Sequence, residues 1–215
     1  MTKRNPSLER VEGHDTLWTV RKGNLRCTIV GLPDGSVCLY SPVEKTGGIV
    51  AETHDVRFLL APNHYHNKAV SEHVQLFGEA RLVCTDAARP RLDKITGQRF
   101  EPLSSLADAL PDNVEFAEPE GLKTGELWLI VRTGNELAWI VTDAFCGLQD
   151  NENEAAHPGF LKTFPKYGLK DKARFSDWVR ERLEEESPTM IIPCHGEIVR
   201  GTSLRTELDN LLKTL

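Results

Sequence analysis

A chain of 215 residues, 40% of them hydrophobic and 27% charged, is long enough to bury a substantial core, and it has the composition of a globular protein. The formal net charge of −6 argues against a nucleic-acid partner, which would require a basic face. The N-terminus lacks the apolar core of a signal peptide, and no run approaches the roughly 18 apolar residues of a membrane helix. We therefore expect a cytoplasmic protein without a membrane segment.

The cysteines support the same compartment. The chain has five cysteines (Cys27, Cys38, Cys84, Cys146 and Cys194) and no CxxC pair. Cys27, Cys38 and Cys84 lie inside apolar runs. An odd, scattered set of this kind is typical of reduced thiols in a cytosolic protein and not of a disulfide framework.

The first part of the chain reads mainly as β-structure. Short segments rich in Val, Ile, Leu and Trp are separated by turn residues, among them Pro33-Asp34-Gly35. A helix with Val70, Val74 and Phe77 at helical spacing is expected over 68–77. The expected strands are 17–20, 25–30, 37–41, 56–61 and 80–85.

The second part mixes strands with longer helices. After the strand that ends at residue 85, the sequence up to about residue 125 is charged and predicts irregular structure. A hairpin is then expected from strands 127–132 and 137–142. An acidic loop spans 149–156. An amphipathic helix around Phe175–Leu183, a strand over 190–193 and a closing leucine-rich helix at 204–215 follow. This order predicts a single α/β domain over residues 1–215, with sheets covered by helices.

Three of the expected strands end at residues able to bind a metal. His64 and His66 follow the strand at 56–61, Asp143 follows the strand at 137–142, and His195 follows the strand at 190–193. Ligand sites in α/β folds lie outside the carboxyl ends of strands. Imidazole and carboxylate are ligands that zinc and iron accept, so the pattern predicts one metal site assembled from distant segments.

These motifs, in this order, resemble those of the metallo-β-lactamase superfamily. His64-Tyr65-His66 takes the place of the first histidine motif, Asp143 the place of the later carboxylate, and His195-Gly196 that of the C-terminal histidine. The resemblance covers roughly residues 15 to 200. Within this region the sequence is similar to that of an uncharacterised branch of the superfamily. The resemblance implies a four-layer αβ/βα sandwich with a metal site at the edge between two sheets.

The sequence departs from the superfamily pattern at three ligand positions. Lys68-Ala69 stands where the pattern has Asp-His, and no histidine occurs near residues 120–125. A binuclear site is therefore not expected. We predict a single zinc, with iron or manganese as alternatives, bound by His64, His66, Asp143 and His195. Lys68 would act as an electrostatic partner of the bound group or of Asp143.

These features favour a metal-dependent hydrolase acting on a small molecule whose identity the sequence does not give, with Asp143 and Lys68 in catalytic roles. A second interpretation is a metal-free protein that keeps the fold and binds a small molecule or a partner. A third is redox or oxygen chemistry at an iron site. Each candidate also has an ordinary structural interpretation, since Asp143 can cap a turn and His195 can be a loop residue beside a glycine.

Overall fold

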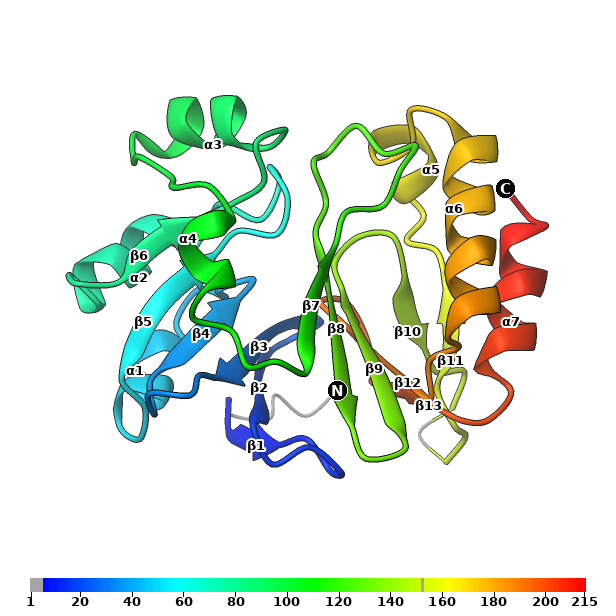
Figure 1. Cartoon of the computed structure of the whole chain (residues 1–215), viewed down its shortest axis with the longest axis horizontal. Helices are drawn as coiled ribbons and strands as arrows, with labels where there is room; N and C mark the ends of the chain where they lie inside the picture. Colours follow the sequence, from blue (N-terminus) through cyan, green and yellow to red (C-terminus); the bar gives the residue numbers. More distant parts are fainter. Residues whose placement is uncertain (1–5, 152) are drawn as a thin grey trace. The chain divides into compact units, whose positions relative to one another are not determined.

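The computed structural model describes residues 6–151 and 153–215. The chain forms two compact units, the first ending at Asp112 and the second spanning Asn113–Leu215 (Figure 1). That the two units make up one domain, as the sequence suggests, stays a prediction. In the described part of the chain, none of the helices has the length and apolar character needed to cross a membrane.

The first unit is built on a six-stranded sheet whose spatial order follows the chain order. The first four strands are antiparallel, whereas the last three are parallel to one another, so the latter end at the same edge of the sheet. The strands are β1 (Leu8–Arg10), β2 (Leu17–Lys22), β3 (Leu25–Gly31), β4 (Val37–Tyr40), β5 (Val56–Leu60) and β6 (Arg81–Val83).

Helices cover one face of this sheet. Val50, Val70 and Leu92 come from three different helices and share one apolar cluster with sheet residues such as Ile29 and Leu39. Burial of these side chains supplies the main driving force for packing the helices on the sheet. The helices are α1 (Gly47–Ala51), α2 (Val70–Leu76), α3 (Arg89–Thr96) and α4 (Ser104–Ala107).

The second unit contains a five-stranded sheet in the order β13-β12-β9-β8-β7. Its only parallel pair is β9 with β12, in which Val141 lies opposite Pro193. These two strands therefore deliver the residues that follow them to the same edge. The strands are β7 (Val114–Ala117), β8 (Trp128–Thr133), β9 (Glu136–Val141), β12 (Met190–Pro193) and β13 (Val199–Arg200). A separate hairpin pairs β10 (Cys146–Leu148) with β11 (His157–Gly159).

Two long helices, α6 (Lys172–Glu185) and α7 (Leu204–Leu212), pack side by side against this unit (Figure 1). The short α5 (Phe164–Tyr167) precedes them. The Asp171 carboxylate accepts from the Arg174 amide and so caps the first turn of α6. The apolar face of each helix contributes to one cluster with the sheet, which contains Phe175, Val179, Leu183, Leu204, Leu208, Leu212, Trp128 and Trp139.

The expected strands and the expected helices at 68–77, 175–183 and 204–215 are present within a few residues. The turn at Pro33-Asp34-Gly35 is confirmed, because the Gly35 amide donates to the Leu32 carbonyl and Gly35 has φ +86°. The expectation of irregular structure up to residue 125 is wrong, since this stretch contains α3, α4 and β7. Leu92 is the one fully buried side chain of α3, which leaves little apolar periodicity to read. All five cysteines are buried thiols outside any disulfide.

Candidate metal centre

Asp143 and His195 lie next to each other in the second unit. Each stands two residues beyond the end of its strand, and the parallel register of β9 and β12 aligns Val141 with Pro193. Nε2 of His195 donates to Oδ1 of Asp143 over 3.0 Å. The two side chains are 19% and 16% exposed, so the pair is largely shielded from solvent. The two residues therefore lie side by side at one edge of the sheet, and their role as metal ligands stays a prediction.

The main chain around His195 is fixed by the β10 strand. The Gly147 amide donates to the His195 carbonyl over 3.0 Å, and the Glu197 amide donates to the Gly147 carbonyl over 3.1 Å. These bonds form an isolated parallel bridge between Gly147 and Gly196. The loop is therefore held on both sides of Gly196, the residue directly after the histidine.

Glu126 is a buried carboxylate beside Asp143 that was not predicted from the sequence. Its Oε1 accepts from Nε1 of Trp128 over 2.8 Å and from the Ala144 amide over 3.2 Å. Burial and the negative charge of Asp143 raise the pKa of Glu126 to about 7, against the hydrogen bonds that favour the carboxylate. Through Ala144, Glu126 fixes the turn that carries Asp143. The signal in the sequence was a lone acid directly before an apolar strand.

His64 and His66 lie in the loop between β5 and α2 of the first unit. Oδ1 of Asn63 accepts from the Tyr65 amide over 2.8 Å and from the His66 amide over 3.2 Å, which is an Asx-turn. Nδ2 of Asn67 in turn donates to the His64 carbonyl over 2.7 Å. Two asparagines therefore set the conformation of this loop.

The two histidine rings have different surroundings. Nδ1 of His66 lies 2.6 Å from Oγ of Ser41, a buried residue directly after β4. This contact orients the half-buried His66 ring and leaves Nε2 as the ring nitrogen not used in the bond. The His64 ring is buried and meets Tyr65 edge-on, with 4.4 Å between ring centres. Lys68 is exposed in the turn before α2.

The predicted site residues thus come from both units: His64, His66 and Lys68 from the first, and Asp143 and His195 from the second. The convergence of the complete set stays a prediction. Within the second unit the donor types fit a divalent cation. An imidazole nitrogen and a carboxylate oxygen face each other, and the proton that they share is one that a cation would replace.

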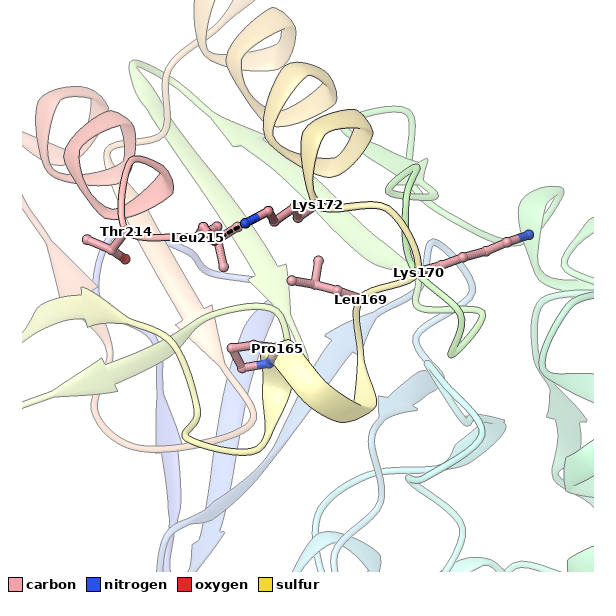
Figure 2. A pocket seen from close by; sticks show the side chains of 6 residues that line it. All are labelled: Pro165, Leu169, Lys170, Lys172, Thr214 and Leu215. Carbon is pink, nitrogen blue, oxygen red and sulfur yellow. Dashed lines mark hydrogen bonds between the residues drawn. The ribbon is translucent and has the colours of Figure 1, made fainter.

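A hollow elsewhere in the second unit contains none of these residues. It has a volume of about 390 Å³ and lies where α5, the start of α6 and the end of the chain meet (Figure 2). Nζ of Lys172 donates to the Leu215 carbonyl over 2.8 Å across it. Its lining consists of Pro165, Leu169, Lys170, Lys172, Thr214 and Leu215.

Known proteins resemble this chain in structure and not in sequence. No family model matches it, and no curated protein matches it in sequence. The DIM-1 metallo-β-lactamase structure has a TM-score of 0.67 at 11% identity, with 98% of each chain covered. The mono-zinc form of the FIM-1 metallo-β-lactamase from Pseudomonas aeruginosa has a TM-score of 0.66 at 11% identity, covering 100% of this chain and 97% of that one.

A metal-soaked Flv1 flavodiiron core from Synechocystis gives a TM-score of 0.64 at 11% identity. The match covers 98% of this chain but only 61% of the flavodiiron core, so the chain spans about three fifths of that protein. These likenesses extend over nearly the whole chain and agree with the mixed sheets and helices described above. The expectation of an α/β fold of this type is confirmed: the chain has the metallo-β-lactamase fold.

Proposed function

We propose that this protein is a metal-dependent hydrolase with one divalent cation bound by His66, Asp143 and His195, and by His64 as a fourth donor. The observation that carries the proposal is the Asp143–His195 pair at the common edge of β9 and β12, in a chain with the metallo-β-lactamase fold. His66 is the supporting donor from the first unit, because Ser41 already fixes its Nδ1. Such support of a ligand's second nitrogen is typical of metal-binding histidines.

His64 is the fourth donor that the sequence predicts. Its ring packs against Tyr65, whereas His66 is oriented by a hydroxyl group. We keep His64 as a ligand in the proposal and test it separately from the other three.

A single ion is proposed because the chain lacks donors for a second one. Lys68-Ala69 replaces two of them, and the histidine missing near residues 120–125 is a donor of the first ion. Lys68 would also repel a second cation, so Lys68→Asp should raise the metal content. The fold accepts a single zinc in the FIM-1 enzyme, and the flavodiiron likeness keeps iron as an alternative.

The chemistry that a divalent ion supplies in such a site is a lowered pKa of water and polarisation of an ester, amide or phosphoryl oxygen. Asp143 and His195 hold their donor atoms at the sheet edge, and Glu126 fixes the turn behind Asp143. The ammonium of Lys68 would attract the negative charge that develops on the substrate. We propose a small-molecule substrate and a cytoplasmic location, which the reduced cysteines support.

Metal analysis of protein purified without a metal-affinity tag tests the first step. We expect about one equivalent of zinc, iron or manganese, as a mononuclear site would hold. His66→Gln, Asp143→Asn and His195→Gln should each lower the metal content strongly, and His64→Gln decides the role of the fourth donor. His157→Gln, at an exposed histidine, is the control and should leave the content unchanged.

Hydrolysis is tested on the metal-reconstituted protein with ester, thioester and phosphodiester probes. Turnover by the wild type that is lost in Asp143→Asn supports the proposal. Stoichiometric metal without turnover of any probe contradicts the hydrolase assignment.

The second candidate is a metal-free binding protein. The bond between His195 and Asp143 favours it, because that bond satisfies both groups without a cation. Near-zero metal after reconstitution, together with an unchanged structure, would establish this alternative in place of the hydrolase.

A further inference from the structure

An arginine stands on the aromatic ring between the two loop histidines. Cζ of Arg91, in the first turn of α3, lies 5.2 Å from the centre of the Tyr65 ring. Tyr65 is 38% exposed, whereas the neighbouring His64 is buried and His66 is half-buried. Both residues belong to the first unit, so their relationship is internal to it.

Arg91 differs from most arginines of the chain in its partners. Arg57 pairs with Asp34, Arg81 with Glu101, and the neighbouring Arg89 with Asp86. Among residues 6–151 and 153–215, the Arg91 guanidinium contacts the Tyr65 ring and no carboxylate. Lys68, three residues beyond Tyr65, is likewise exposed without a carboxylate partner in the described structure.

The position of Arg91 in its helix does not explain this charge. The first turn of α3 contains no acidic residue, and cations at a helix N-terminus are unfavourable against the helix dipole. A solvent-exposed arginine gains only about 0.5–1 kcal/mol from an aromatic face. Arg91 and Lys68 thus place two cations beside one histidine loop in a chain of net charge −6.

A guanidinium lying over an aromatic ring keeps its N–H edge available. That edge forms a planar fork that matches the two oxygens of a carboxylate or phosphate. Tyr65 restricts the rotation of Arg91 and so lowers the entropy lost when such a group binds.

We propose that Arg91, supported by Tyr65, binds a carboxylate or phosphate group of the substrate. A role for Arg91 in substrate binding rests on the proposed hydrolase function, and it narrows the substrate class to anionic molecules. The competing explanation is that the Arg91–Tyr65 contact only anchors the loop 63–67 to α3.

Anion binding is tested first on metal-free protein, because this readout does not depend on catalysis. Inorganic phosphate and succinate are titrated separately while the Arg91 side-chain N–H and Tyr65 amide signals are followed by NMR. We expect both signals to shift with at least one anion, and affinity to fall about tenfold or more in Arg91→Gln. The stronger of the two anions identifies the preferred group.

Two further variants separate the contributions of the Arg91 charge, the planar guanidinium fork and positive charge elsewhere on the surface. Arg91→Lys keeps the charge but not the fork, so its affinity should lie between those of wild type and Arg91→Gln. Arg205→Gln removes an exposed arginine of α7 that makes no ion pair within the described part of the chain, and it should not change binding. Equal anion affinity in wild type and Arg91→Gln overturns the proposal.

Hydrolysis of a matched ester pair then separates this proposal from the hydrolase assignment. We expect 4-nitrophenyl succinate to be preferred over 4-nitrophenyl acetate, and Arg91→Gln to raise KM for the anionic ester alone. If both esters are hydrolysed equally well by wild type and variant, the anion proposal fails while the hydrolase stands. If neither is hydrolysed but anion binding needs Arg91, the hydrolase fails and the anion site stands.

Discussion

Gly147 and Gly196 approach so closely that neither position has room for a side chain. A Cβ atom on Gly147 would overlap the Glu197 carbonyl, and one on Gly196 would overlap the Gly147 carbonyl. Gly196 also has φ +82°, a conformation that favours glycine. This contact presses β10 against the loop of His195 and so sets the position of the histidine relative to Asp143.

Gly147→Ala should displace His195 from Asp143, because the added methyl group forces the Glu197 segment away. We expect the metal content to fall. We also expect the NMR signals of the His195 ring to stop responding to the substitution Asp143→Asn. Gly134→Ala is the control: it introduces strain of roughly 1–2 kcal/mol at φ +58° in the β8–β9 turn, far along the sheet from this loop. Metal binding that is lost equally in both variants would indicate general destabilisation and contradict the positioning role.

Ser41→Ala should weaken metal binding by about 10- to 100-fold, as loss of a supporting hydrogen bond to a ligand histidine does. Ser41 lies at φ +57°, an unfavourable conformation for a residue with a side chain, and its hydroxyl lies 2.6 Å from Nδ1 of His66. Ser41→Gly loses the same hydroxyl but relieves the backbone, so it should be more stable than Ser41→Ala with the same loss of affinity. Zinc titration and thermal unfolding measure the two effects. A wild-type metal affinity in Ser41→Gly would rule out a role of the Ser41 hydroxyl in metal binding.

Much of this arrangement could be predicted from the sequence. Asp143 and His195 follow apolar strands, and ligand sites in α/β folds lie beyond the ends of such strands, so a common location could be predicted. The neighbouring position of β9 and β12 and the direct bond between the two side chains could not. Glu126 and Ser41 could not be predicted in the same way. Their roles depend on contacts with Ala144 and His66, which are distant in the sequence. The α3 helix was missed because its pattern is mostly polar, with Leu92 its one fully buried side chain.

Glu126→Gln should stabilise the metal-free protein at alkaline pH. The pKa of Glu126 is raised from 4.5 to about 7, so between these values the native state binds more protons than the unfolded state. Its contribution is fully present below pH 4.5 and is lost as the pH rises through 7. The amide of the variant still accepts from Trp128 and Ala144 but does not ionise. At pH 8 the variant should gain about 1.4 kcal/mol for each unit of the pKa shift.

Urea unfolding at pH 5 and pH 8 in the presence of a chelator measures this difference. Glu181→Gln, at an exposed position of α6, should give the same change at both pH values. If the difference in unfolding free energy between wild type and Glu126→Gln does not widen from pH 5 to pH 8, ionisation of the buried carboxyl does not cause the loss of stability.

His73 should make the first unit sensitive to acid. Its ring is fully buried, Nδ1 donates to the Ala69 carbonyl over 2.9 Å, and Nε2 has no hydrogen-bond partner among the described residues. A Cβ on Gly47 would lie 3.2 Å from that nitrogen, so the start of α1 closes over it. Burial lowers the pKa of His73, against the opposing effects of the Ala69 carbonyl and Glu72.

Because the unfolded chain takes up this proton near pH 6.5 and the native state does so only at lower pH, stability is full above 6.5. It falls as the pH drops through the native pKa of His73. His73→Gln does not titrate, so its stability should decline less between pH 7.5 and pH 5 than that of the wild type. Urea unfolding at both pH values measures the decline, and His157→Gln serves as the exposed control. Parallel declines in wild type and His73→Gln would mean that other groups cause the acid sensitivity.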